Sequence, residues 1–150
     1  MGQRGEAWVI AQSALFILFA VAPQIGPSWP SADVFRLPGW ALVAAGILLL
    51  ARSAIDLGRS LTPFPRPLPD GRLVTTGAYR LVRHPIYSGV IISALGLSLV
   101  TISPVRLALT IVLFAFFDMK ARREERWLQE QYPEYAAYKS HVKKLIPWLY

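Results

Sequence analysis

The chain has 150 residues, of which 54% are hydrophobic and 17% are charged, and its mean hydropathy is +0.40. A soluble domain of this length cannot bury so much apolar surface in one core, so the composition indicates a membrane protein with one domain over residues 1–150. The chain contains no cysteine, which excludes disulfides, cysteine-ligated zinc and thiol nucleophiles. We also predict no metal site.

Four apolar stretches follow one another along the chain, at residues 7–22, 37–51, 86–102 and 105–117. Each is shorter than the roughly 20 residues that a transmembrane helix needs, so each must recruit flanking interfacial residues. Pro23, Gly26, Pro27 and Pro30 separate the first pair, and Ser103-Pro104 joins the second pair tightly. The pattern predicts an all-α integral membrane bundle of about four transmembrane helices, arranged as two hairpins.

The first stretch also resembles a secretory signal peptide, because Arg4 precedes it and Ala20-Val21-Ala22 ends it. Cleavage there would leave Pro23 as the first residue, which is a poor context. An uncleaved helix also gives the even number of spans that the charges require. We therefore predict that the first stretch remains as a transmembrane helix.

The segment between the second and third stretches, residues 52–83, is too rich in proline for a long helix, so it is either a structured or a disordered loop. The helical pattern of the fourth stretch continues beyond the membrane. We predict one helix over residues 105–131, whose last third stands in water. A shorter amphipathic helix over residues 134–144 follows it.

Basic residues are distributed unevenly between the two sides of this bundle. Fourteen of the 16 lysines and arginines fall near the N-terminus, in the middle loop or in the tail, and only Arg36 and Arg106 fall on the other side. The positive-inside rule then places both termini and the middle loop in the cytoplasm of a multi-pass protein of the inner (plasma) membrane. The net charge of +7 reflects this topology and anionic lipid headgroups, and we predict no binding to nucleic acid.

Polar residues gather where the middle loop meets the third stretch, in the sequence GAYRLVRHPIYSG. Pro85 suits the first position of a helix, with His84 as its cap, and such an N-terminus exposes free backbone N–H groups. Together with Arg83 it favours an anion such as a carboxylate or phosphate. The alternative is that Arg83 binds lipid headgroups, His84 only caps the helix and Tyr87 is an interfacial aromatic residue.

A second cluster lies on the extension of the fourth helix. Six residues share one stripe at helical spacing: Phe114, Asp118, Ala121, Glu125, Leu128 and Tyr132. Asp118 has a partner in Arg122 at i+4, and Glu124 has Lys120 at i−4, but Glu125 has no such partner. We predict that Glu125 contacts a ligand, and the alternative is an ion pair with an arginine of the middle loop. On the third helix, Gly89, Ser93 and Gly96 predict a small face for close helix packing.

Taken together, several motifs resemble a known family. They are Gly77-Ala78-Tyr79-Arg80, Arg83-His84-Pro85-Ile86-Tyr87-Ser88-Gly89, Glu124-Glu125, Tyr132-Pro133-Glu134-Tyr135 and Ile146-Pro147. These motifs resemble the isoprenylcysteine carboxyl methyltransferases and their phospholipid-methyltransferase relatives. The resemblance covers about residues 52–147. It is closest to the compact bacterial and archaeal members, so the methyl acceptor stays open, as does the oligomeric state.

The resemblance implies an S-adenosylmethionine pocket at the cytosolic membrane surface, formed by the loop and the C-terminal amphipathic helices. The cofactor-binding residues that it implies are Gly77, Tyr79, Arg83, His84, Tyr87, Glu124 and Glu125. It implies catalytic roles for Glu125 and for Arg52, which matches a family arginine that engages the substrate. The cofactor's carboxylate, amine and hydroxyls suit a site with arginine and histidine on one wall and glutamate on the other. The predicted acceptor is a lipid or another lipophilic, membrane-associated molecule with a carboxylate, amine or hydroxyl group.

Two other functions fit parts of the pattern. Membrane sterol and steroid reductases, which use NADPH, carry a similar Arg-His-Pro-x-Tyr element, but they usually have asparagine where this chain has Ile86 and an acid where it has Val90. A membrane scaffold that has lost its activity would also keep the fold. We expect the methyltransferase rather than either alternative.

Overall fold

The structure is a computed structural model that describes residues 5–23 and 32–150. The helices are α1 (Glu6–Ala20), α2 (Ala32–Leu57), α3 (Pro85–Val100), α4 (Pro104–Gln131) and α5 (Tyr135–His141), with short 3-10 helices η1 (Gly58–Ser60) and η2 (Gly77–Arg80). No strand occurs in these two described ranges, which agrees with the all-α prediction. The predicted Gly26, Pro27 and Pro30 connection and Arg4 lie outside the described residues.

The helix boundaries agree with the predictions to different degrees. α4 runs from Pro104 to Gln131 as predicted, and the Ser103 hydroxyl caps it by accepting a hydrogen bond from the Arg106 N–H. α2 is longer than its apolar stretch, because its polar end continues the helix as far as Leu57. α5 is shorter than predicted, because the residues after His141 leave the helix and run beside the start of α3.

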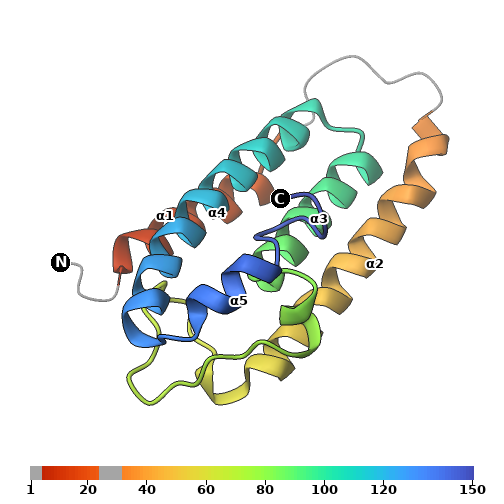
Figure 1. Ribbon diagram of the computed structural model, residues 1–150. Helices are drawn as coiled ribbons and strands as arrows, with labels where there is room; N and C mark the ends of the chain where they lie inside the picture. The colour runs from red at the N-terminus through yellow and green to blue at the C-terminus, as the bar shows by residue number, and fades with distance from the viewer. Residues whose placement is uncertain (1–4, 24–31) are drawn as a thin grey trace.

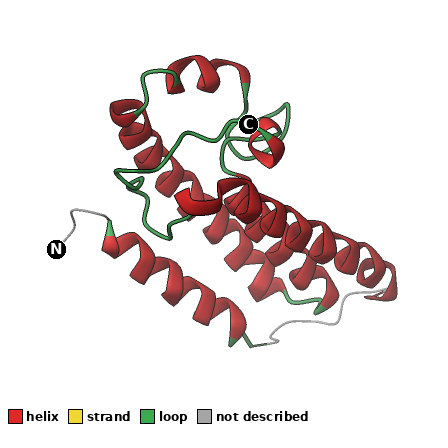
Figure 2. Cartoon of the chain, turned by 90° about the horizontal axis from the view of Figure 1, so that it is seen from below, coloured by secondary structure: helices red, strands yellow, loops and turns green. Residues whose placement is uncertain are grey.

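The helices are arranged in space as α2, α3, α4 and α1 (Figure 1). α3 and α4 form the predicted second hairpin, but α1 and α2 do not form the first one. α2 packs on α3, whereas α1 packs on α4, so the α3–α4 pair separates them (Figures 1 and 2). The middle segment, α5 and the start of α1 gather at one end of the bundle (Figure 1).

Glycines set the distance between α2 and α3. A Cβ atom added to Gly46 would lie 2.6 Å from the Gly89 carbonyl oxygen, and one added to Gly96 would lie 2.6 Å from the Gly39 carbonyl oxygen. Both distances are shorter than a carbon–oxygen contact allows, so the two backbones touch only because these positions lack side chains. The prediction of a small packing face on α3 is confirmed.

Apolar side chains fill the centre of the bundle and also cover its outside. Leu113, Phe116 and Phe117 of α4 form the core with Phe19 and Ala94. Many other large apolar residues point outward, with exposed fractions of 63% for Ile17, 69% for Leu48 and 66% for Ile111. By length and composition, one described segment, residues 33–60, could cross a membrane, whereas α1 and α3 are apolar but shorter. These features are consistent with a helical membrane protein.

Candidate active site

The Arg83-His84-Pro85 element starts α3 as the sequence predicts, with His84 as N-cap and Pro85 as the first helical residue. The backbone N–H groups of Arg83 and His84 are not free, however. They donate hydrogen bonds to the carbonyl oxygens of Lys143 (2.8 Å) and Lys144 (3.1 Å). The segment after α5 therefore takes the His84 donor, one of those that we expected to be open to an anion, and it fixes the backbone at this helix end.

Glu125 lies at the centre of a buried charge cluster. Its Oε1 atom accepts hydrogen bonds from Arg83 Nε and lies 2.8 Å from Arg83 Nη2, and its Oε2 atom lies 2.9 Å from Lys139 Nζ. The His84 Nε2 atom lies 3.3 Å from the same Oε1. The side chains of Arg83 and Glu125 are only 8% and 4% exposed. The structure thus shows the ion pair that was the alternative for Glu125, with a partner from 42 residues away that helical spacing cannot reveal.

The charges around Glu125 keep it ionised. Burial raises the pKa of its carboxyl group, but the hydrogen bond and charge of His84, together with Lys139 and Arg83, outweigh burial and hold the pKa well below its usual range. A carboxylate with these partners is already compensated. Glu125 thus fixes the Arg83 and His84 side chains although it does not itself line a cavity.

Glu124 has a different environment. Its Oε2 atom accepts a hydrogen bond of 2.5 Å from the Tyr87 hydroxyl and lies 3.8 Å from His84 Nδ1. The His84 and Tyr87 rings stack with centroids 5.3 Å apart. Lys120 at i−4 donates its hydrogen bonds to Gln12 Oε1 (2.6 Å) and the Pro63 carbonyl (3.1 Å), while its ammonium also interacts electrostatically with Glu124.

The stripe on α4 faces inward, as its spacing predicts. Asp118, Ala121 and Glu125 are buried, and the other three members are half-buried. Asp118 makes the predicted pair with Arg122 at 2.8 Å. It also binds Lys144 Nζ (2.7 Å) and accepts a hydrogen bond from the Tyr150 hydroxyl (2.9 Å), so it anchors the tail to α4.

Arg52 and Gly77 meet at Asp56, a residue that the sequence analysis did not select. Asp56 accepts hydrogen bonds from Arg52 Nε (3.2 Å) and from the backbone N–H of Ala78 (2.8 Å). Gly77 has a φ of +61°, and a Cβ atom there would overlap the Asp56 carboxylate. The i,i+4 spacing of Arg52 and Asp56 was the available signal for this contact.

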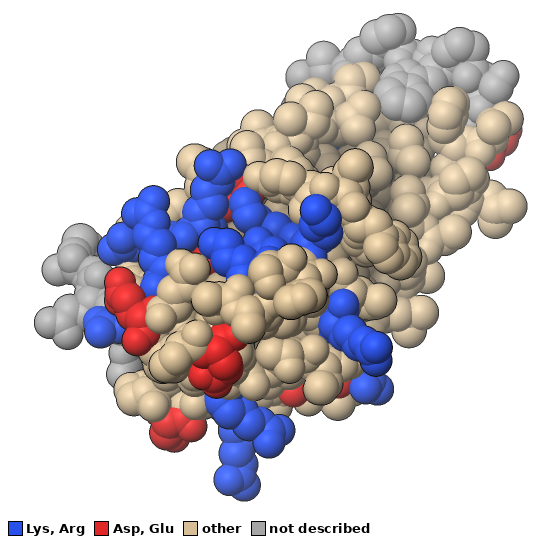
Figure 3. Space-filling view, in the orientation of Figure 1, with Lys and Arg blue, Asp and Glu red and all other residues tan. Residues whose placement is uncertain are grey.

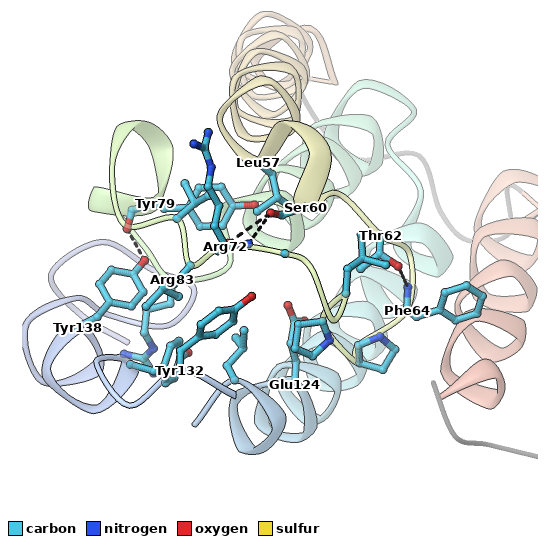
Figure 4. A pocket seen from close by; sticks show the side chains of 18 residues that line it. Leu57, Ser60, Thr62, Phe64, Arg72, Tyr79, Arg83, Glu124, Tyr132 and Tyr138 are labelled. Atoms are coloured by element: carbon cyan, nitrogen blue, oxygen red, sulfur yellow. Dashed lines mark hydrogen bonds between the residues drawn. The ribbon is translucent and has the colours of Figure 1, made fainter. Parts of the chain in front are cut away.

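Two cavities lie beside these residues and share part of their walls. The smaller, of about 80 Å³, is lined by polar and aromatic residues that include Ser60, Arg72, Tyr79, Arg83, Glu124 and Tyr132. Figure 4 shows Ser60 and Arg72 on one wall of it and Glu124 and Tyr132 on the other. The larger, of about 370 Å³, is mostly apolar and has Tyr79, His84, Tyr87, Lys120 and Glu124 among its lining residues. Tyr79 and Glu124 line both cavities.

More than half of the chain matches one family of known proteins. Residues 34–135 match the model of the phospholipid methyltransferase family, which is more than half of the chain. The chain belongs to the phospholipid methyltransferase family. The match begins in α2 and ends at α5, so it includes both cavity-lining motifs and leaves α1 outside.

Of three individual relatives, two are named as methyltransferases and one as a metal-resistance protein. A rice (Oryza sativa subsp. japonica) protein named "Probable protein-S-isoprenylcysteine O-methyltransferase" is 33% identical over 115 residues, which are 74% of this chain and 60% of the relative. Protein-S-isoprenylcysteine O-methyltransferase of Saccharomyces cerevisiae is 40% identical over 82 residues, 53% of this chain and 34% of the relative. A cobalt-zinc-cadmium resistance protein of Cupriavidus metallidurans is 37% identical over 84 residues, 53% of this chain and 38% of the relative. The chain spans 60% or less of the length of these relatives.

The resemblance drawn from the motifs is therefore confirmed at the level of the phospholipid methyltransferase family. The structure brings Tyr79, His84, Tyr87 and Glu124 together around the larger cavity. Arg52, Gly77 and Glu125 are not among the residues that line either cavity. The sequence analysis missed Ser60, Arg72 and Lys120 as wall residues, since nothing in their local spacing distinguishes them.

Proposed function

We propose that this chain is an S-adenosylmethionine-dependent methyltransferase acting on a lipophilic or membrane-associated acceptor at the cytosolic membrane face. The observation that carries the proposal is the position of Glu124 in a wall shared by two cavities, a smaller one lined in part by Arg72 and Arg83 and a larger one that is mostly apolar. The two arginines of the smaller cavity suit a charged methyl donor, and the apolar walls of the larger one suit a lipophilic acceptor. Membership of the phospholipid methyltransferase family and the names of the rice and yeast relatives support the same reaction class.

The residues of the smaller cavity fit the cofactor chemically. S-adenosylmethionine has a carboxylate, an amine and ribose hydroxyls, and it supplies an electrophilic methyl group when bound. Arg72 and Arg83 suit the carboxylate, while Glu124 and the tyrosine hydroxyls suit the amine and the ribose. The cavity is smaller than the usual 300–1,000 Å³ range of ligand sites, so we infer that the loop wall at residues 60–74 moves when the cofactor binds.

The residues of the larger cavity fit an amphiphilic acceptor. Leu57, Ile86 and Val90 give it apolar walls, and Glu124 lies among its polar groups. Methyl transfer needs alignment and exclusion of water more than a nucleophilic side chain. A carboxylate acceptor needs no base, whereas an amine or hydroxyl acceptor would transfer its proton to the Glu124 carboxylate.

Two predicted site residues take supporting roles in this proposal. Glu125 is a positioning residue that orders Arg83 and His84, and Glu124 is the acid that faces the ligands. Arg52, which is 64% exposed and paired with Asp56, supports η2 and through it Tyr79. Arg52 does not line either cavity, so we propose no contact between it and the substrate.

We further propose that α1, α2, α3 and the first half of α4 cross the inner membrane, with both termini and the site on the cytoplasmic side. The outward apolar residues on α1, α2 and α4 support lipid contact along the bundle. Lysine and arginine gather toward the end that holds the middle segment and α5, whereas the visible surface beyond it is almost uncharged (Figure 3). Flanking residues extend the short helices to the membrane surface.

Ligand titration of the purified protein tests the proposal. We expect S-adenosylhomocysteine to bind and NADPH not to bind. Glu124→Gln should weaken S-adenosylhomocysteine by roughly ten- to a hundredfold, the usual worth of a charge-assisted hydrogen bond. Glu130→Gln, an exposed acid on the same helix, serves as the control that should change nothing. Binding of NADPH alone would instead support a reductase, and binding of neither ligand would support a scaffold.

A further inference from the structure

The tail that follows α5 carries the most exposed large apolar residues at the cytosolic end of the molecule. Trp148 is 88% exposed and Leu149 is 75% exposed. Trp148 also has a φ of +61°, a left-handed conformation that a bulky residue adopts only under strain. The N–H groups of Leu149 and Tyr150 bond back to the Ile146 carbonyl and close this turn. The strained turn therefore holds the indole away from the protein.

The tail is fixed beside α4 at a definite level of the bundle. The Tyr150 ring lies 6.3 Å from the Phe114 ring, and the Tyr150 hydroxyl binds Asp118. Above this level, α4 exposes apolar side chains such as Ile111, and below it the helix carries Arg122. The exposed Trp148 and Leu149 thus lie where an apolar surface changes into a basic one.

Basic side chains lie around Tyr150, next to this exposed tip. Arg122 donates a hydrogen bond to the Tyr150 hydroxyl at 3.3 Å, and Lys144 lies 4.7 Å from the Tyr150 ring centroid. Lys143 is exposed in the same segment. In Figure 3 the lysine and arginine side chains form a band across this face, at the level where Figure 1 shows the tail. Tryptophan and leucine beside a basic band match the headgroup region of a membrane that contains anionic lipid.

The same tail is bonded to the candidate site. The carbonyls of Lys143 and Lys144 accept from the N–H groups of Arg83 and His84, and the Leu145 carbonyl accepts from the Ser88 hydroxyl at 2.7 Å. A change in the position of the tail would therefore move the start of α3, because three hydrogen bonds join the two directly. Because residues 143–145 bond directly to the start of α3, no flexible linker separates the exposed tip from the site.

We propose that residues 145–150 are an interfacial anchor whose Trp148 and Leu149 insert into the headgroup region of an anionic bilayer, and that this seating holds Arg83 and His84 in place for cofactor binding. The insertion stands independently of the proposed function. The effect on cofactor affinity rests on it.

Fluorescence quenching tests the insertion. The protein is placed in nanodiscs of phosphatidylcholine, with or without phosphatidylglycerol, that contain lipids brominated near the headgroup or near the bilayer centre. The signal of Trp148 is the difference between wild type and Trp148→Phe. We expect strong quenching by the shallow bromines and weak quenching by the deep ones. An unquenched Trp148 in both lipid mixtures, as a soluble partner or a second copy on the tip would give, would overturn the proposal.

The contribution of the basic side chains is tested by changing the lipid mixture. Phosphatidylglycerol should increase the shallow quenching of Trp148, and the double variant Arg122→Gln/Lys143→Gln should remove that increase. An increase that persists in the double variant would overturn the assignment of these residues as the anionic-lipid contacts.

Cofactor affinity tests the coupling. In nanodiscs with phosphatidylglycerol, Trp148→Ser/Leu149→Ser should weaken S-adenosylhomocysteine by about fivefold or more, the low end of typical coupling between sites. Trp148→Phe/Leu149→Ile keeps the tip apolar and should bind like wild type. Equal affinity of the serine variant and wild type would refute the coupling. A wild-type protein that binds no S-adenosylhomocysteine would refute the proposed function instead, and the quenching result would still stand.

Discussion

For Glu125, the sequence predicts the position of the side chain but not the groups that it binds. Its position on the α4 stripe correctly predicts an inward carboxylate. The missing i±4 partner led to the expectation of a ligand, yet Arg83 and Lys139 arrive from other elements. Local spacing reports only neighbours on the same helix, so a partner brought by tertiary folding is invisible to it.

The substitution Glu125→Gln should therefore lower stability. It leaves Arg83, which is 8% exposed, without its full countercharge, and removing one partner of a buried pair costs about 3 kcal/mol or more. Chemical unfolding in detergent measures the change. Glu124→Gln is the matched control and should cost about 1 kcal/mol, since it mainly weakens the hydrogen bond from Tyr87. Equal stabilities of Glu125→Gln and wild type would show that Glu125 is not a fold-stabilising partner.

The same carboxylate predicts a pH dependence. Its folded pKa is lowered from the ordinary value of 4.5, so the stability it contributes is fully present above 4.5. That contribution decreases as the pH falls below 4.5 toward the folded pKa. Melting temperatures of wild type and Glu125→Gln should therefore converge as the pH is lowered from about 6 to about 3. A constant difference over this range would contradict the lowered pKa.

At the scale of elements, the sequence predicted helices better than connections. The cap and proline signals at His84-Pro85 located the start of α3, because they act through local backbone geometry. The predicted start of the next helix at residue 105 lies one residue after the observed start of α4 at Pro104. α2 continues to Leu57, beyond the apolar stretch that ends at residue 51, because a drop in hydropathy does not by itself end a helix. The Arg52–Asp56 pair and the hydrogen bond of Ser53 to the Leu49 carbonyl continue it in a polar environment.

The η2 turn depends on a glycine in a way that can be tested. Gly77→Ala adds a Cβ atom that overlaps Asp56 at a φ of +61°, so it should cost about 2 to 4 kcal/mol and displace Tyr79. Gly58→Ala is the matched control, since Gly58 has a φ of +51° but no atom within 4 Å of the added Cβ. That variant should cost about 1 kcal/mol. Unfolding free energies distinguish the two, and equal costs would mean that contact with Asp56 does not require a glycine at position 77.

The middle segment is a structured loop, which settles the alternative that its prolines left open. Gln131 of α4 donates a hydrogen bond of 2.8 Å to the Leu68 carbonyl, and Arg72 and Ser60 bond to each other. Proline content alone cannot separate a folded loop from a disordered one, because both avoid long helices. Only the contacts with the extension of α4 decide it.

Cofactor binding should protect the end of this segment further. Val74 and Tyr79 line the smaller cavity with Glu124, so a ligand there should slow hydrogen exchange over residues 74–79. The measurement compares exchange with and without saturating S-adenosylhomocysteine. The connection at residues 101–103, far from the cavity, is the internal control and should not change. Unchanged exchange at residues 74–79 despite measurable binding would place the cofactor elsewhere.

For the whole molecule, composition predicted the class but not the order of the helices. α1, α2 and α3 are apolar on more than one side, so no amphipathic stripe on them indicates which neighbour each packs against. The order α2, α3, α4 and α1 follows instead from the close glycine contacts of α2 with α3 and from the aromatic contact of Trp8 with Phe116 at 5.5 Å. Such complementarity depends on pairs of surfaces, which a pattern in one segment cannot show.

The membrane topology is the remaining prediction at this scale. Fourteen of 16 basic residues fall in regions that four spans would place on one side, and the middle segment, α5 and the start of α1 do gather at one end of the structure (Figure 1). Because the chain has no cysteine, single cysteines can be introduced without removing any natural one. Asp70→Cys in the middle segment and Ser140→Cys on α5 should resist a membrane-impermeant maleimide in intact cells.

The decisive positions are those where four spans and one span differ. If only α2 crosses the membrane, Thr101 must lie on the same side as Asp70, and Gln3 must lie on the same side as Pro27. If all four helices cross, Thr101→Cys and Pro27→Cys should react from outside, whereas Gln3→Cys should react only after the cells are permeabilised. Positive charge at Gln3's end of the chain favours this second pattern, because Arg4 would otherwise have to cross to the outer surface. Protection of Thr101→Cys in intact cells, with labelling restored by permeabilisation, would show that the α3–α4 hairpin does not reach the outer surface.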